Sequence, residues 1–139
     1  MNKITGTITK ITSDNLFVKV DIQSKGYLFS ACVIQAGYGY TDKDIGTPVT
    51  MLFKETDTII SHQNEIKISC RNSFPSIVTS ITYGPVLSRI STKYKENVVT
   101  SLITSESAQS MNLKKGDSVI CLVKSTSVML YQGEYNSDG

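Results

Sequence analysis

The stretch Ser69-Cys70-Arg71-Asn72 decides how the chain is divided, because it opens the second of two similar halves. At an offset of 70 positions the two halves align without a gap. Identical pairs at this offset include Asn2 and Asn72, Ile11 and Ile81, Gly46 and Gly116, and Lys54 and Lys124. Apolar positions match where identities fail. The sequence therefore indicates an internal duplication into units of about 60–70 residues, small enough to need support from one another.

Each half has the pattern of short strands separated by turn signals. Leu16–Ile22 alternates apolar and polar residues, which is typical of a strand with one buried face. We expect strands at 4–11, 16–22, 27–33, 49–54 and 56–61, and again at 76–81, 86–91, 98–103, 118–123 and 127–131. A short helix is expected from Ser105 to Met111. Five short strands in each half predict an all-β fold of two tandem OB-like five-stranded barrels, with a short helix in the second.

The expected domains follow from the duplication. They are a first barrel at 1–63, a second barrel at 64–131 and a flexible tail at 132–139. Ser61–Glu65 is the expected linker between the barrels. Gln35–Tyr40 carries two glycines, which are costly inside a helix, so this segment is not expected to be helical.

Composition argues against several classes of protein. The chain of 139 residues is 40% hydrophobic and has a net charge of +2, too small to indicate a nucleic-acid partner. No apolar run approaches the roughly 20 residues that span a bilayer, and the N-terminus has no apolar signal core. Neither membrane association nor export is therefore expected. Cys32, Cys70 and Cys121 are widely spaced and odd in number, which fits reduced thiols in a cytoplasm and argues against disulfides or a zinc site.

Three segments of the second half carry hydrogen-bond donors that have no matching acceptors. They are Ser69–Asn72, Thr104–Ser107 and Val123–Ser125. Arginine supplies a planar fork of N–H groups, lysine a compact charge, and hydroxyls short neutral bonds. Hydrogen bonds to an ionised oxygen are the strong ones, so the set suits a tetrahedral dianion such as molybdate, tungstate or sulfate.

Each segment also has a purely structural interpretation. Thr104 and Ser107 are read, on their own, as caps of a short helix. Arg71 is equally suited to a surface ion pair, and Lys124 to a strand end where its ammonium reaches water. An enzyme is not expected, because there is no activated nucleophile, no paired carboxylates, and the one histidine, His62, lies in the linker.

The combination of these segments resembles the molybdate-binding Mop, or molbindin, family of TOBE domains. The resembling blocks are Ser69–Asn72, Leu102–Ser107, Leu113–Val119 and Leu122–Val128. The resemblance implies a barrel that binds molybdate or tungstate through hydrogen bonds, without direct metal coordination and without an organic cofactor. The oxyanion-binding residues that it implies are Ser69, Arg71, Asn72, Thr104, Ser107, Lys124 and Ser125, with Asn72 bracing the strand turn.

The first half departs from this pattern. Met1 stands in place of Arg71, and Ile34 and Gly37 in place of Thr104 and Ser107, whereas Lys54 is retained. We therefore expect a degenerate site in the first barrel, which acts as a structural or interfacial partner. The resemblance further implies a homo-oligomer, with a trimer favoured over a dimer, and sites at subunit interfaces.

The function expected from the sequence is cytoplasmic binding of molybdate or tungstate for storage or homeostasis. One alternative is an oxyanion-sensing module that acts on a transcriptional regulator or a transporter. Against it, the sequence shows no helix-turn-helix and no P-loop. A second alternative is an OB-fold that binds single-stranded nucleic acid, using the aromatic residues of the first half, Tyr27, Phe29, Tyr38, Tyr40 and Phe53.

Overall fold

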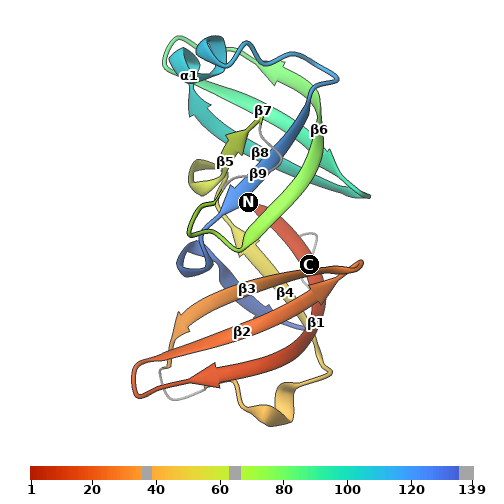
Figure 1. Cartoon of the computed structure of the whole chain (residues 1–139), viewed down its shortest axis with the longest axis vertical. Helices are drawn as coiled ribbons and strands as arrows, with labels where there is room; N and C mark the ends of the chain where they lie inside the picture. The colour runs from red at the N-terminus through yellow and green to blue at the C-terminus, as the bar shows by residue number, and fades with distance from the viewer. Residues whose placement is uncertain (36–38, 63–66, 135–139) are drawn as a thin grey trace.

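The computed structural model describes residues 1–35, 39–62 and 67–134. Within these residues the chain forms two five-stranded antiparallel sheets stacked end to end (Figure 1). The strands are β1 (Asn2–Ser13), β2 (Phe17–Ser24), β3 (Tyr27–Ile34), β4 (Pro48–Phe53), β5 (Ile59–Ser61), β6 (Asn72–Thr82), β7 (Leu87–Tyr94), β8 (Asn97–Thr104), β9 (Ser118–Val123) and β10 (Met129–Gln132). The fold predicted from the strand pattern, two tandem five-stranded barrels, is confirmed.

Helical turns lie between the strands. The predicted helix of the second barrel is confirmed as α1 (Ser105–Ser110). Three 3-10 turns were not predicted from the sequence: η1 (Asp42–Asp44), η2 (Glu55–Asp57) and η3 (Ser125–Ser127). Residues 56–58 and 127–128 were expected to be strand, but η2 and η3 occupy most of these positions. η2 and η3 lie where the chain passes from one sheet to the other, between β4 and β5 and between β9 and β10.

The internal repeat extends to the backbone. The bounds of β2, β3, β4 and η2 recur in β7, β8, β9 and η3 at the offset of 70. The first strand of each half also has a register shift at the same place in its pairing with the next strand. It lies between Ile8 and Lys10 in β1 and between Val78 and Ser80 in β6. Gly46 and Gly116, both at φ near +90°, provide the same left-handed turn before β4 and β9. The predicted duplication is thus confirmed.

The two barrels exchange their last strands. The strand order is β10-β4-β1-β2-β3 in one sheet and β5-β9-β6-β7-β8 in the other. Ile59 of β5 pairs with Leu122, and Met129 of β10 pairs with Leu52. The sheets therefore do not follow the contiguous ranges 1–63 and 64–131 expected from the sequence, because β5 and β10 each cross into the other barrel.

An aromatic cluster joins the two cores. Phe74 of β6 stacks on Phe29 and on Phe53 of the first barrel, with ring centroids 4.7 and 5.4 Å apart. Tyr94 of β7 meets Phe74 edge to face at 5.2 Å. All four side chains are almost completely buried. The apolar core is consequently continuous across the junction, which holds the barrels in one orientation.

Two buried asparagines clasp the barrels from opposite sides. The Ser30 N–H of β3 donates to Asn72 Oδ1 at 2.7 Å, and Asn72 Nδ2 donates back to the Ser30 carbonyl at 2.9 Å. At the equivalent place Asn2 exchanges the same two bonds with Thr100 of β8, both at 2.8 Å. Each asparagine therefore binds the backbone of the opposite barrel, so the junction has an approximate twofold symmetry.

The C-terminal end of the described chain is part of the fold. Gln132 belongs to β10 and Gly133 donates to the Pro48 carbonyl at 3.0 Å, so the expected tail at 132–139 begins inside the fold. Residues 135–139 of this tail, residues 63–66, which include 63–65 of the expected linker, and residues 36–38 lie outside the described residues. His62 Nε2 lies 2.9 Å from the Met111 carbonyl. No helix in the described ranges is long and apolar enough to span a membrane.

Candidate anion-binding site

Arg71 and Lys124 each lie one residue beyond the end of the β6–β9 ladder, at the junction of the barrels. Asn72 and Val123 are paired across β6 and β9, and Arg71 and Lys124 are the next residues out from this pair. Cys70, which precedes Arg71, is half-buried and donates its thiol hydrogen to the Val123 carbonyl at 3.3 Å. Burial raises the pKa of this thiol, and its hydrogen bonds to the Asn72 and Val123 carbonyls, together with the charge of Lys124, oppose the shift. Two donor segments predicted from the sequence are thus brought together.

Neither Arg71 nor Lys124 is paired with a carboxylate among the residues that the structure describes. Both side chains are exposed, and neither forms an ion pair within the described ranges. Ser69 is also exposed, so Ser69 and Arg71 face solvent while Cys70 turns inward, as alternation predicts. These residues precede β6 instead of lying within it. An anion could therefore reach both charges without breaking an ion pair of the described residues.

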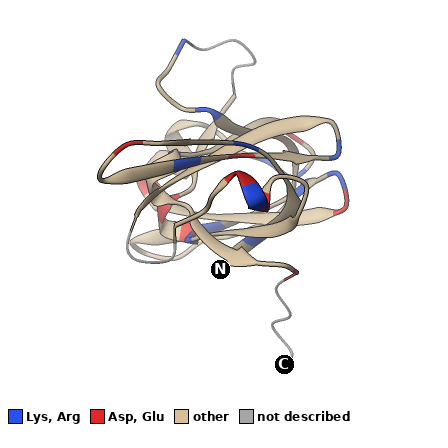
Figure 2. Cartoon of the chain, turned by 90° about the horizontal axis from the view of Figure 1, so that it is seen from below, with Lys and Arg blue, Asp and Glu red and all other residues tan. Residues whose placement is uncertain are grey.

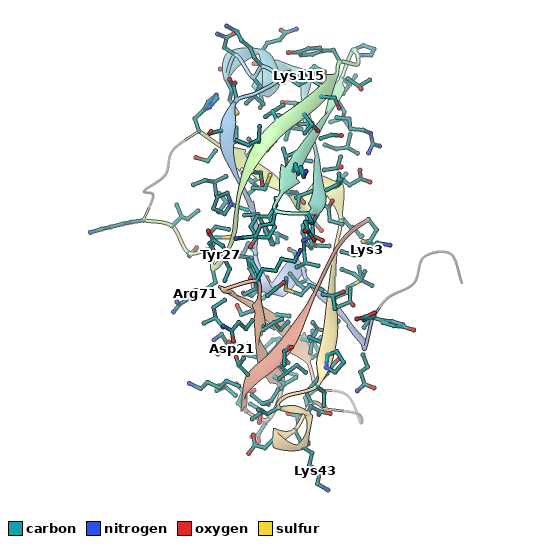
Figure 3. All side chains as sticks on the ribbon, turned by 90° about the vertical axis from the view of Figure 1, so that its right-hand side faces the viewer. Lys3, Asp21, Tyr27, Lys43, Arg71 and Lys115 are labelled. Atoms are coloured by element: carbon teal, nitrogen blue, oxygen red, sulfur yellow. The ribbon has the colours of Figure 1, made fainter. Side chains whose placement is uncertain are left out.

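Arg71 borders a cavity of about 320 Å³ that is walled mostly by the first barrel. Its lining includes Lys10 of β1, Lys19 of β2 and Ser30 of β3. Asp21, the one acidic residue of the lining, is paired with Lys19 at 2.8 Å. In Figure 3 Arg71 lies at mid-height on the same side of the molecule as Asp21. The cavity is therefore net basic, and cations of both barrels contribute to it.

Sequence reasoning missed Lys10 and Lys19. Both lie on strands of the first barrel, which was expected to be degenerate, and no local pattern sets them apart from other surface lysines. Only the packing of β3 against β6 brings this wall to Arg71. At the offset of 70, Lys19 corresponds to Arg89, whereas Lys10 corresponds to Ser80 and is one of several lysines, with Lys3 and Lys43, that the second half does not repeat.

Ser125 and Asn72 connect the site to the first barrel. Ser125 Oγ lies 2.5 Å from Ser30 Oγ. Asn72 is fully buried, and its Nδ2 donates to the carbonyls of Ser30 and Val123, at 2.9 and 3.1 Å. Both amide hydrogens are therefore used inside the protein. Asn72 has no donor left for a ligand, and its place among the predicted binding residues changes to that of a brace beneath Arg71.

Thr104 and Ser107 lie at the other end of the second barrel. Ser107 N–H donates to Thr104 Oγ1 at 3.1 Å, and Thr104 Oγ1 donates to Ser107 Oγ at 2.8 Å, with both residues exposed. Thr104 caps α1, as the structural interpretation expects. β8 runs from Asn97 at the junction to Thr104 at the far end. Figure 1 shows α1 at the top of the molecule, whereas Arg71 is at mid-height in Figure 3. One chain therefore does not bring this pair to Arg71 and Lys124.

The arrangement does not favour the other site types. Within the described residues no group of three or more His, Cys, Asp or Glu could hold a metal ion. Phe29 and Phe53, expected as stacking platforms in the nucleic-acid alternative, are buried in the core. Tyr38 lies outside the described residues. Figure 2 shows basic and acidic segments interspersed instead of a single basic face.

Comparison with known proteins decides the family. A sequence model of the TOBE domain matches residues 68–130, which form the second half of the repeat. The second half of the chain is therefore a TOBE domain. A 72-residue stretch is 39% identical to the molybdenum transport protein ModE of Azotobacter vinelandii, covering 51% of this chain and 27% of that protein. The chain thus matches about a quarter of the length of this curated relative.

Solved structures extend the comparison to the whole chain. The cytoplasmic molybdate-binding protein ModG, in a molybdate-bound crystal form, superimposes with a TM-score of 0.83 and 22% identity over 96% of both chains. This similarity establishes a shared two-barrel fold. A molybdate-binding protein from Sporomusa ovata is 37% identical, covering 42% of this chain and 88% of the other, with a TM-score of 0.42.

Proposed function

We propose that the protein binds a tetrahedral oxyanion, molybdate or tungstate, at the Arg71–Lys124 junction. The observation that carries the proposal is the pair of exposed cations without a carboxylate partner in the described ranges, beside a basic cavity. Relatives described as molybdate-binding or molybdenum-transport proteins support this choice of ligand. Ser69 and Ser125 supply further hydroxyl donors close to the two cations.

Binding is passive in this proposal. The oxyanion keeps its charge and its oxygens accept hydrogen bonds from a preorganised set of donors, so no proton transfer or metal–protein bond is involved. Asn72 holds Arg71 in place through its bonds to Ser30. Selectivity over sulfate comes from cavity size, because the larger oxyanions have longer bonds to oxygen. The protein acts as a binding protein and not as an enzyme.

We further propose that a second copy of the chain supplies Thr104 and Ser107. Exposed apolar residues recur at the offset of 70, in the pairs Leu16 and Val86, Phe17 and Leu87, Leu28 and Val98, and Ile59 and Met129. Leu87 pairs with Thr104, and Leu28 borders the Arg71 cavity. Contact between these apolar patches would bring the hydroxyl pair of one copy to the cations of another. A homo-oligomer, trimeric or dimeric, follows from this arrangement.

The cellular role that fits this chemistry is storage or homeostasis of molybdate or tungstate in the cytoplasm. A passive binder without a catalytic group buffers its ligand. The sensing alternative would require docking onto another chain, and the nucleic-acid alternative lacks exposed aromatic platforms at Phe29 and Phe53. Neither alternative is favoured by a specific contact.

The test is calorimetric titration with molybdate, tungstate and sulfate, together with the native mass of the assembly. Arg71→Ala and Lys124→Ala should each weaken molybdate binding at least tenfold, because each removes a charge-assisted bond worth about 1.5–3 kcal/mol. Lys54→Ala is the matched control, since Lys54 occupies the equivalent position in the first barrel, and it should leave the affinity nearly unchanged. Equal losses in all three variants, or no binding by the wild type, would refute the proposal.

A further inference from the structure

The first barrel retains a cavity at the place equivalent to the Arg71–Lys124 site. It measures about 170 Å³ and is lined by Met1, Lys54, Glu55, Thr56 and Leu102. The first four stand, at the offset of 70, where the second barrel has Arg71, Lys124, Ser125 and Thr126. The position of the degenerate first site is therefore still a cavity, and core side chains do not fill it.

The backbone around this cavity is preserved. Lys54 precedes η2 at φ −72° and ψ 145°, and Lys124 precedes η3 at φ −65° and ψ 145°. The Asn2–Thr100 clasp beneath the cavity repeats the Asn72–Ser30 clasp beneath the other site. The two places consequently differ in side-chain chemistry and not in scaffold.

The decisive difference is Glu55 in place of Ser125. Ser125 is neutral, and its hydroxyl lies 2.5 Å from the hydroxyl of Ser30. Glu55 places a carboxylate at this position: Oε2 accepts a hydrogen bond from Arg89 Nη1, and Oε1 accepts one from the Met1 ammonium group at 3.3 Å. The Glu55 side chain is 22% exposed, so much of its charge faces the protein. The Met1 ammonium and the Arg89 guanidinium are therefore already paired with a carboxylate of the chain itself.

We propose that Glu55 is a built-in counter-ion that closes the first-barrel cavity to free oxyanions, and that removing its carboxylate opens a second molybdate or tungstate site there. This inference rests on the proposed function of the second barrel. A dianion entering the cavity would meet the like charge of Glu55 and would have to displace its bonds to Arg89. With a hydroxyl at this position, the Met1 ammonium and Arg89 would be left without that partner, beside Lys54 in the lining of the cavity, and a free anion could take its place.

The variant Glu55→Ser, which copies the second barrel, tests the inference in the full-length chain. Titration of the wild type with molybdate should give one class of sites, and the variant should add a second class that raises the stoichiometry about twofold. The added class should be weaker, because Met1 has no guanidinium to match Arg71. Glu96→Ser is the matched control: it removes the same charge from a side chain that is 90% exposed and pairs with Lys25 at 3.2 Å. This control should add no site.

A double variant separates this inference from the proposed function. In Arg71→Ala/Glu55→Ser the second-barrel site is disabled, so molybdate binding that remains above the level of Arg71→Ala reports the first cavity alone. An unchanged stoichiometry in folded Glu55→Ser, with normal binding by the wild type, would overturn the inference and leave the proposed function intact. A gain in Glu96→Ser equal to that in Glu55→Ser would also overturn it, because the effect would then be one of net charge.

Discussion

Replacing Asn72 by alanine should loosen the junction and the anion site together. Asn72 is fully buried and takes part in three hydrogen bonds, two with Ser30 and one with Val123. At about 1 kcal/mol for each bond, with buried partners left unsatisfied, the free energy of unfolding should fall by roughly 3 kcal/mol. For a chain of this size that corresponds to a Tm lower by about 10 °C.

The assay is thermal and urea unfolding followed by circular dichroism, with molybdate titration of the folded variant. The matched control is Asn2→Ala, which removes the equivalent clasp to Thr100 and one bond to Thr58. Both variants should lose similar stability. Weaker molybdate binding should follow from Asn72→Ala alone, because Asn72 lies directly beside Arg71. A Tm for Asn72→Ala within about 1 °C of the wild type would refute the assignment of this amide as a clasp.

Three further outcomes can be measured. Phe74→Ala should lower the free energy of unfolding by about 3–5 kcal/mol in urea titration, because Phe74 stacks on rings of the other barrel; a loss below 1 kcal/mol would contradict a shared core. Burial tends to raise the pKa of Glu55, but the Met1 ammonium and Arg89 outweigh it and lower the pKa from 4.5. Glu55 therefore stabilises the fold above its unfolded pKa, and this stability is lost as pH falls through the folded pKa. Glu55→Gln should flatten the acid limb of a plot of stability against pH, and an unchanged limb would speak against these pairs. Lys19→Ala should weaken molybdate binding less than Arg71→Ala and reduce its dependence on salt, whereas an unchanged salt dependence would mean that the cavity wall does not attract the anion.

The strands could be predicted from the sequence because their signals are local. Alternation in Leu16–Ile22 and the repeat at an offset of 70 both reflect which face of each strand is buried. The exchange of β5 and β10 could not be predicted, since periodicity gives the face of a strand but not the sheet that it joins. The 3-10 turns at Glu55 and Ser125, which lie just before β5 and β10, carry no distinctive residue pattern.

The candidate site was only partly predictable for a similar reason. Arg71 and Lys124 could be found because their segments are distinctive, and the pairing of Asn72 with Val123 brings them together. The roles of Asn72 and Glu55 depend on contacts with residues far away in the chain. Burial turns the Asn72 amide into an internal clasp, and the fold gives the Glu55 carboxylate Arg89 as its partner. Roles that depend on such tertiary contacts cannot be predicted from the sequence.

Anomalous diffraction at the molybdenum absorption edge, from crystals grown with molybdate, tests the central claim most directly. We predict a peak within hydrogen-bond distance of the Arg71 guanidinium and the Lys124 ammonium, with Thr104 and Ser107 of a neighbouring copy on its other side. Peaks that lie elsewhere, with Arg71 and Lys124 contacting only solvent, would contradict the claim.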